Sequence, residues 1–165
     1  MEKINRPLWA PWRIEYIRSE KNLECFICDK KSKDKNDSTN HIVTHGKTAF
    51  VILNRYPYNS GHLMIAPYRH TDDICTLSTE EQNEITSLRI KAIEVLRKLM
   101  APEGFNLGYN LGSCAGAGLK DHIHEHIVPR WNGDTNFMPV LGDTRVVPES
   151  LDDTCQLIRD TWQSF

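Results

Sequence analysis

The chain has 165 residues, a formal net charge of −2 and five cysteines. This length suits a single domain whose hydrophobic core needs no covalent staples. The nearly balanced charge gives no overall basic field, so we expect no nucleic-acid partner. No run approaches the roughly 18 apolar residues of a membrane span, and the charged start lacks the apolar core of a signal peptide. The odd number of cysteines, two of them in a Cys-x-x-Cys pair, suggests a reducing compartment, and we expect a cytoplasmic protein with no membrane contact.

Two β-strands are predicted in the first half of the chain, at residues 49–54 and 62–67. Both are rich in apolar residues, and the segment between them is typical of a turn. A long helix follows, because Ser78 and Glu81 have the Ser-x-x-Glu spacing of a capping box, and Pro102 is expected to end it. Its apolar residues recur near the helical period and predict one buried face: Ile85, Leu88, Ala92, Val95, Leu96 and Leu99.

The second half of the chain supplies two further strands, at residues 105–111 and 122–129, and a short C-terminal helix at residues 150–165. Asp152 and Asp153 are favourable in the first turn of that helix because its N-terminus carries partial positive charge. These elements predict an α+β fold, with an antiparallel sheet of about five strands, one long helix and a short C-terminal helix.

Three histidines alternate along one short run, at His122, His124 and His126. In a strand, side chains two residues apart share a face, so all three imidazoles are expected on one side. An imidazole has an ordinary pKa of about 6.5 and can serve as a nucleophile, a proton donor or a metal ligand near neutral pH. The preceding run, residues 112–118, is glycine-rich, and its backbone N–H groups could cup an anion. The pattern predicts a neutral nucleophile beside a phosphate cradle.

Other interpretations of the histidine run stay open. A single metal held by all three is disfavoured, because the outer two Cα atoms would stand about 13 Å apart on an extended strand. Two neighbouring histidines could share a metal, so a metal-dependent hydrolase that uses strand histidines and the Cys-x-x-Cys pair is one alternative. A non-catalytic nucleotide-binding module is the other.

The His-x-His-x-His pattern followed by two apolar residues resembles the histidine-triad superfamily of nucleotidyl hydrolases and transferases. Residues 50–55 and 61–67, with Arg69 and His70, are similar to the nucleoside-binding hairpin of that family. Residues 8–13, 128–134 and 136–138 resemble its bacterial diadenosine tetraphosphate phosphorylase-like branch. The resemblance implies a single histidine-triad domain over residues 1–165, with its core at about 8–148, and a homodimer.

The resemblance also implies a mechanism. His124 would attack the α-phosphorus of a nucleotide and form a nucleotidyl-histidine. Water or inorganic phosphate would then release the mononucleotide, and the expected substrates are dinucleoside polyphosphates such as diadenosine tetraphosphate. His126 would donate to the phosphate oxygens, with His122 as the third catalytic histidine. The backbone of Gly116, Ala117 and Gly118 would add N–H donors.

Further substrate contacts follow from the same resemblance. Asn54 matches the position that binds ribose hydroxyls, His62 a position near the phosphates, and Asn110 a polar position that reaches ribose or phosphate. Phe50 and Ile52 would wall the base. From the sequence alone, each of these residues is at least as readily explained as a turn or core residue.

The chain departs from the family pattern at three positions. Many relatives carry Ser or Thr shortly before the triad, where this chain has Gly118, and Asp121 is an additional residue before His122. Proton delivery to the leaving group is therefore an open question. Glu125 stands where an apolar residue is common. Its side chain should point away from the histidines, either into solvent or toward a cation.

The second constellation is Cys25 and Cys28, whose spacing lets two thiolates chelate one ion as half of a tetrahedral zinc site. Alternatives are a redox pair or two free thiols. Histidines must complete a zinc site, and four are candidates: His41, His45, His70 and His122. Some triad proteins and the related galactose-1-phosphate uridylyltransferases use a histidine after the second hairpin strand and the first triad histidine. That resemblance implies a closed, structural zinc site made of Cys25, Cys28, His70 and His122.

The remaining cysteines, at positions 75, 114 and 155, show no partner pattern and are expected to be small buried side chains.

Overall fold

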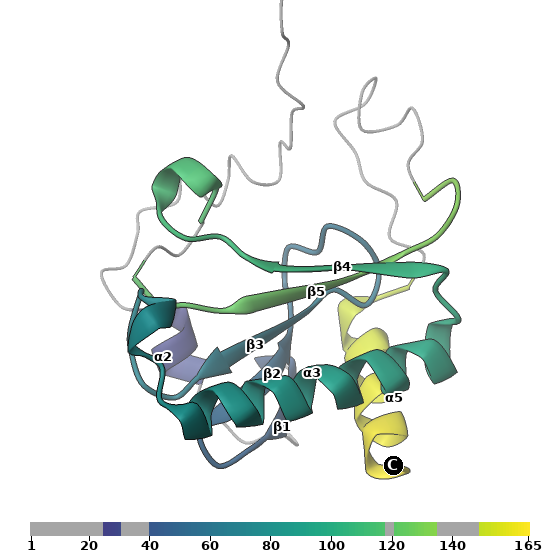
Figure 1. Ribbon diagram of the computed structural model, residues 1–165. Coiled ribbons are helices and arrows are strands. Elements are labelled where there is room, and N and C mark those ends of the chain that lie inside the picture. The colour runs from purple at the N-terminus through teal and green to yellow at the C-terminus, as the bar shows by residue number, and fades with distance from the viewer. Residues whose placement is uncertain (1–24, 31–39, 118–120, 135–148) are drawn as a thin grey trace, which may run out of the picture.

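The fold is an antiparallel sheet with two helices packed on one face (Figure 1). The computed structural model describes residues 25–30, 40–117, 121–134 and 149–165. The sheet has five strands in the spatial order β1-β2-β3-β5-β4. The strands are β1 (Ile42–His45), β2 (Ala49–Leu53), β3 (Leu63–Pro67), β4 (Gly104–Tyr109) and β5 (Glu125–Arg130). Each neighbouring pair is antiparallel, so the predicted α+β architecture is confirmed.

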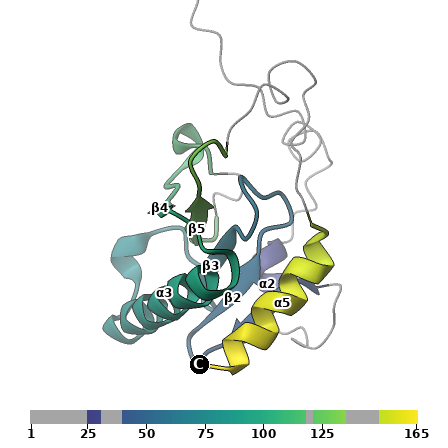
Figure 2. The ribbon, with the colours of Figure 1, turned by 90° about the vertical axis from the view of Figure 1, so that its right-hand side faces the viewer.

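The long helix α3 (Thr79–Met100) begins and ends where the sequence predicts. Ser78 is its N-cap, and Ser78 and Glu81 form the reciprocal bonds of a capping box. Ala101 adopts a left-handed conformation at φ 45° and closes the C-terminus. The predicted apolar stripe faces the sheet, with Ile85 and Leu96 fully buried. The C-terminal helix α5 (Leu151–Gln163) is capped by Ser150 and lies beside α3 (Figure 2).

Both faces of the central strands are buried. Along β2, Val51 and Leu53 point into the core shared with α3 and α5. Phe50 and Ile52 point to the other face and pack with Ile27 of the short helix α2 (Phe26–Lys30). Alternation with period two thus explains why β2 is a continuous apolar run: neither face is left to solvent.

The strand that carries the triad differs from its predicted bounds. The predicted strand covers residues 122–129, but β5 begins only at Glu125. Before β5, the Ile123 N–H donates to the Thr71 carbonyl, 2.6 Å away. This segment is therefore hydrogen-bonded to the loop after β3 and not to a neighbouring strand. The expectation that all three histidines form one row of a strand is therefore wrong, since only His126 lies in β5.

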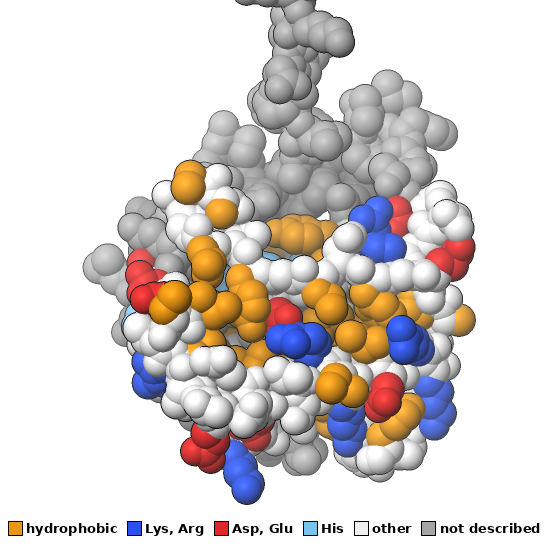
Figure 3. Space-filling model, viewed as in Figure 1, with side chains coloured by type: hydrophobic (Ala, Val, Ile, Leu, Met, Phe, Trp, Pro, Cys, Tyr) orange, Lys and Arg blue, Asp and Glu red, His pale blue; other side chains and the backbone are white. Residues whose placement is uncertain are grey.

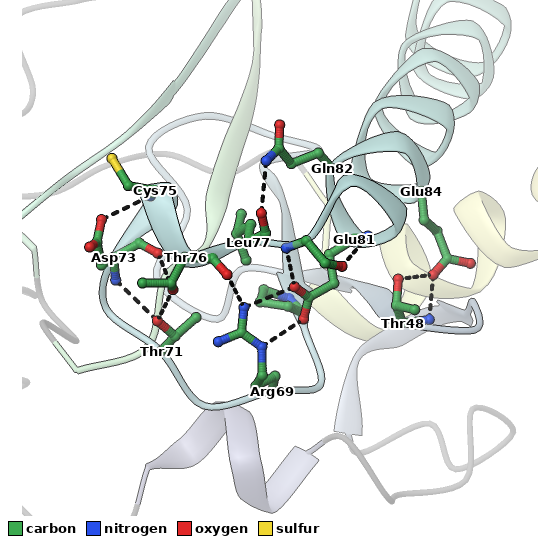
Figure 4. A network of polar contacts seen from close by, with 12 residues as sticks. Thr48, Arg69, Thr71, Asp73, Cys75, Thr76, Leu77, Glu81, Gln82 and Glu84 are labelled. Carbon is green, nitrogen blue, oxygen red and sulfur yellow. Dashed lines mark hydrogen bonds and ion pairs between the residues drawn. The ribbon is translucent and has the colours of Figure 1, made fainter.

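The segment after β3 is tied to the start of α3 by a polar network (Figure 4). The Arg69 guanidinium binds both carboxylate oxygens of Glu81, at 3.0 and 2.9 Å, and donates to the Thr76 carbonyl at 2.7 Å. This ion pair and its hydrogen bonds lower the pKa of Glu81. The turn that includes η2 (Ile74–Thr76) is thereby anchored to α3, and the Thr71 and Thr76 hydroxyls are hydrogen-bonded at 2.9 Å.

Within the described segments, no helix is both long and apolar enough to cross a membrane.

Candidate active site and metal centre

The three triad histidines are all buried, and they divide between two clusters. His124 and His126 pack edge to face, with ring centroids 4.8 Å apart. His122 is fully buried, and its ring packs edge to face against His70 at 5.1 Å. The run therefore supplies two neighbouring imidazoles to one site and a third imidazole to a second site.

The nitrogen that His124 can offer to a substrate follows from its hydrogen bond. Its Nδ1 lies 2.9 Å from the backbone carbonyl oxygen of His122. A carbonyl only accepts, so Nδ1 carries the proton and Nε2 keeps its lone pair. Burial lowers the pKa of His124, against an opposing effect of the bond to His122. The side chain is thus a neutral imidazole with one defined nucleophilic nitrogen.

His126 is oriented by His62, which the sequence places on the opposite side of a turn. The Tyr58 backbone N–H donates to His62 Nδ1 at 3.0 Å, so the proton of His62 resides on Nε2. That Nε2 is 2.9 Å from His126 Nδ1 and donates to it. The proton of His126 is consequently on Nε2. This is the tautomer that a donor to phosphate oxygens requires.

The predicted ribose ligand Asn54 takes part in the same turn. Its Oδ1 accepts the Tyr56 N–H at 2.9 Å, and its Nδ2 is 3.3 Å from His62 Nδ1. Asn54 therefore orders the turn that carries His62. Its contact with ribose stays a prediction, as does the role of Asn110, which is half-buried after β4.

The predicted base wall shares the sheet face of His126. Ile52 pairs with Met64, and Met64 pairs with His126 across the ladder, so the three side chains form a row. Phe50 lies on the same face and is fully buried. Phe50 and Ile52 both pack against α2. Their contact with a nucleotide base stays a prediction.

Only part of the predicted phosphate cradle is described. Gly116 closes the short helix η3 (Ser113–Ala115) with φ 84°, a conformation that favours glycine, and Ala117 follows it. Gly118 lies outside the described residues, so its place relative to the triad stays a prediction. The family-like segments at residues 8–13 and 136–138 also lie outside them.

Glu125 points away from His124 and His126, as expected. Its carboxylate is buried and binds Arg89 of α3, with Nε 2.7 Å from Oε1. The Tyr109 hydroxyl donates to the other oxygen at 3.3 Å. Burial, together with the Glu125 charge, raises the pKa of Tyr109 to about 12. The expected cation partner is therefore present, and the alternative of a solvated carboxylate is wrong.

The four residues proposed as metal ligands converge in the structure. The ligand atoms of Cys25, Cys28, His70 and His122 all lie within 4.8 Å of one another. His122 Nδ1 is 3.3 Å from the Cys25 sulfur and 3.5 Å from the Cys28 sulfur. His70 Nδ1 is 3.3 Å from both the Cys28 sulfur and His122 Nδ1.

These separations fit a tetrahedral ion. In a tetrahedral site, Zn–N bonds of about 2.0–2.1 Å and Zn–S bonds of about 2.3 Å place neighbouring ligand atoms about 3.3–3.8 Å apart. His122 also has the required tautomer, because its Nε2 donates to the Pro67 carbonyl at 2.9 Å and leaves the Nδ1 lone pair facing the cluster. Two thiols and two imidazoles therefore make a donor set that matches zinc in both chemistry and spacing.

The other candidate histidines have different partners. His41 Nε2 is 2.9 Å from an Asp152 oxygen, and His45 Nδ1 is 2.9 Å from the Tyr68 hydroxyl. Of the cysteines expected to be buried, Cys155 is buried, but Cys75 and Cys114 are exposed. Cys75 and Cys114 lie in the short helices η2 and η3 of connecting segments, where their side chains are exposed.

Several groups that shape the site escaped the sequence analysis. The Pro67 and Thr71 carbonyls and the Tyr58 N–H all act through the backbone, which every residue type possesses. No sequence signal distinguishes them. Arg89 is different, because an acidic residue at position 125 called for a cation, and the helical periodicity puts Arg89 on the flank of the buried stripe of α3.

The comparisons with known proteins agree with this geometry. A family model of the HIT domain matches residues 35–133. The AP-4-A phosphorylase of Mycobacterium tuberculosis (strain ATCC 25618 / H37Rv) is 37% identical over 162 residues, covering 94% of this chain and 83% of that protein. The bis(5'-nucleosyl)-tetraphosphatase [asymmetrical] of Schizosaccharomyces pombe is 30% identical over 53% of this chain and 48% of that protein. The chain belongs to the HIT domain family.

Solved structures share the fold. A Zn-bound histidine triad family protein from Mycobacterium smegmatis aligns with a TM-score of 0.67 at 22% identity, over 86% of this chain and 94% of that one. Plasmodium falciparum diadenosine triphosphate hydrolase aligns with a TM-score of 0.63 at 19% identity, over 84% of this chain and 95% of that one.

Proposed function

We propose that this protein, a nucleotide-cleaving enzyme of the HIT family, splits a phosphoanhydride bond of dinucleoside polyphosphates through a covalent nucleotidyl intermediate on His124. The observation that carries the proposal is the bond from His124 Nδ1 to the His122 carbonyl. It leaves Nε2 as a nucleophile in a buried, neutral imidazole. The assignment of the catalytic and binding residues is part of the proposal.

In the first step, the His124 Nε2 lone pair attacks the α-phosphorus, and the bond from that phosphorus to the bridging oxygen breaks. The imidazolium so formed keeps its Nδ1–H on the His122 carbonyl, which stabilises the new positive charge. The His126 Nε2–H donates to the phosphate oxygens as negative charge grows there. A nucleoside polyphosphate leaving group needs little protonation at neutral pH, which suits a site with no assigned acid.

In the second step, an acceptor attacks the nucleotidyl-histidine, and His124 leaves as a neutral imidazole. Inorganic phosphate as the acceptor gives a nucleoside diphosphate, and water gives a monophosphate. The similarity to AP-4-A phosphorylase over most of both chains favours diadenosine tetraphosphate as substrate and phosphate as acceptor.

The test is incubation with diadenosine tetraphosphate, with and without inorganic phosphate. We expect ADP and ATP in the presence of phosphate. AMP and ATP would instead make the enzyme an asymmetric hydrolase. Acid quench of labelled substrate should leave label on the wild type and none on His124→Ala. Turnover with no trapped label and full activity in His124→Ala would overturn the mechanism.

The Cys25, Cys28, His70 and His122 cluster supports a zinc site in the same protein. A closed set of four protein ligands has no open position for water, so the zinc would be structural and would join three chain segments. This closure disfavours the metal-dependent hydrolase considered from the sequence. Metal analysis after chelator-free purification under reducing conditions should give about one zinc per chain.

A homodimer is supported by the edge of the sheet. β4 is an edge strand, and an unpaired edge offers backbone groups to another chain. Leu107 on β4 is 46% exposed and Ile90 on α3 is 54% exposed. Figure 3 shows hydrophobic side chains gathered over β4 and α3 on this face. We expect Leu107→Lys to shift sedimentation from dimer to monomer, and a monomeric wild type would contradict the dimer.

Cysteines without disulfides suit a reducing compartment, and we place the enzyme in the cytoplasm. Fractionation of cells is the direct measurement.

A further inference from the structure

We propose that the Cys25, Cys28, His70 and His122 cluster positions the nucleophile His124 for reaction, in addition to stabilising the fold. The proposal rests on the function proposed above. It names His122 as a positioning residue whose side chain belongs to the metal centre and whose backbone belongs to the active site.

The first step concerns where the nucleophile lies. β5 begins at Glu125, so the sheet ladder does not hold His124. Two contacts fix its segment: the Ile123 N–H donates to the Thr71 carbonyl at 2.6 Å, and His124 Nδ1 donates to the His122 carbonyl at 2.9 Å. The direction of the nucleophile therefore depends on two neighbouring peptide groups that lie outside regular structure.

The second step concerns what holds His122. Its ring is fixed at both nitrogens, because Nε2 donates to the Pro67 carbonyl and Nδ1 faces the two cysteine sulfurs. The carbonyl that holds His124 belongs to this same residue. A metal that draws Nδ1 to the thiolates fixes His122, and through its carbonyl the orientation of the His124 ring.

The third step concerns the opposite side of the segment. His70 completes the cluster, and the carbonyl of the next residue, Thr71, receives the Ile123 N–H. The hydrogen bond between Ile123 and Thr71 therefore joins two residues that each directly follow a candidate ligand, His122 and His70. A metal ion that joins these two ligands would restrict the movement of His124. The crosslink also extends to α2 through Cys25 and Cys28.

The polar groups expected to bind ribose and phosphate are held independently of this cluster. His62 and Asn54 are fixed by the hairpin turn through Tyr58 and Tyr56. Loss of the metal should therefore lower kcat far more than it weakens nucleotide binding. A displacement of about 1 Å at a reacting group costs about 100-fold in rate, so we expect kcat to fall 10- to 100-fold while the Kd for AMP changes less than about 3-fold.

The experiment compares wild type with Cys28→Ser, and with Cys75→Ser as the matched control, since Cys75 is an exposed thiol outside the cluster. Wild type is also stripped with a chelator and reloaded with Zn²⁺ or Co²⁺, so the result does not depend on whether Cys28→Ser folds. The readouts are the Co²⁺ absorption spectrum, AMP binding, amide hydrogen exchange at residues 122–124, the nitrogen chemical shifts of His124, and kcat.

We expect the stripped protein and Cys28→Ser to bind AMP, to lose exchange protection at residues 122–124, and to show altered His124 shifts with reduced kcat. Reloading should restore all of these in wild type, and Cys75→Ser should behave as wild type throughout. Unchanged exchange and shifts without metal would overturn the proposal, and so would global loss of both exchange protection and AMP binding. If loaded wild type cleaves no dinucleotide, the proposed function fails, while exchange and His124 shifts still decide the positioning role.

Discussion

His124 and His126 are two residues apart, yet different parts of the fold hold them. His126 lies in the ladder of β5, and His62 of the hairpin turn sets its tautomer. His124 precedes the ladder, and a loop carbonyl beside the metal-ligand cluster sets its tautomer. The proposed donor His126 thus lies on the sheet, whereas the proposed nucleophile His124 lies on a loop beside the candidate metal ligands. The two can be perturbed separately.

The largest effect is expected from removal of the nucleophile. His124→Ala should lower turnover by several orders of magnitude, since loss of a covalent nucleophile removes the reaction path. Nucleotide binding and the unfolding midpoint should stay close to those of wild type. Rapid-quench kinetics with labelled diadenosine tetraphosphate measures the first effect, and AMP titration with thermal unfolding measures the second. Turnover like that of wild type would refute the role of His124.

The next largest effect is expected at His62, the hairpin residue that orients His126. His62→Phe removes the donor to His126 Nδ1 and frees the tautomer of His126. We expect kcat to fall about 10- to 100-fold, the usual effect of losing a group that orients a functional imidazole. Tyr58→Phe is the matched control, because the contact to His62 uses the Tyr58 backbone N–H. Nitrogen chemical shifts of His126 should report mixed tautomers in His62→Phe alone.

A third prediction concerns Glu125, which lies between the two histidines on the opposite face. Arg89→Ala would leave the buried carboxylate without its cation, and we expect a loss of about 2–4 kcal/mol in the free energy of unfolding. The double variant Arg89→Met with Glu125→Leu should recover most of that loss, since it removes both charges. Urea unfolding measures each value. If the double variant is as unstable as Arg89→Ala, packing and not charge is decisive.

The sequence predicts which side chains come together better than it predicts the hydrogen bonds of the backbone. The four candidate metal ligands converge as expected from their residue types and from the family resemblance. The sequence does not predict β1, because its four residues, Ile42–His45, form too short a pattern to indicate a strand. The start of β5 was misplaced by three residues for a related reason. Ile123 favours a strand by composition, but the Thr71 carbonyl captures its N–H, and only the tertiary structure brings Thr71 there.

The smallest effect is expected at Glu84, which ties the β1–β2 turn to α3 on the hairpin side. Its carboxylate accepts from Thr48 and from the Lys47 N–H at 2.6 Å. Burial alone would raise the pKa of Glu84, but these hydrogen bonds outweigh it and lower that pKa. A lowered folded-state pKa means that the unfolded chain binds the proton more tightly. The stabilisation is therefore present above the unfolded pKa of about 4.3 and is lost as the pH falls through the folded value.

Glu84→Gln should lower the free energy of unfolding by about 1 kcal/mol at pH 7, since the neutral amide still accepts one hydrogen bond. The deficit should shrink as the pH falls below about 4, because the wild-type carboxylate then becomes protonated. Glu94→Gln, at an exposed position of the same helix, is the control and should show no such convergence. Urea unfolding from pH 3 to pH 7 measures the difference. A deficit that stays constant over this range would mean that the carboxylate charge does not hold the turn to α3.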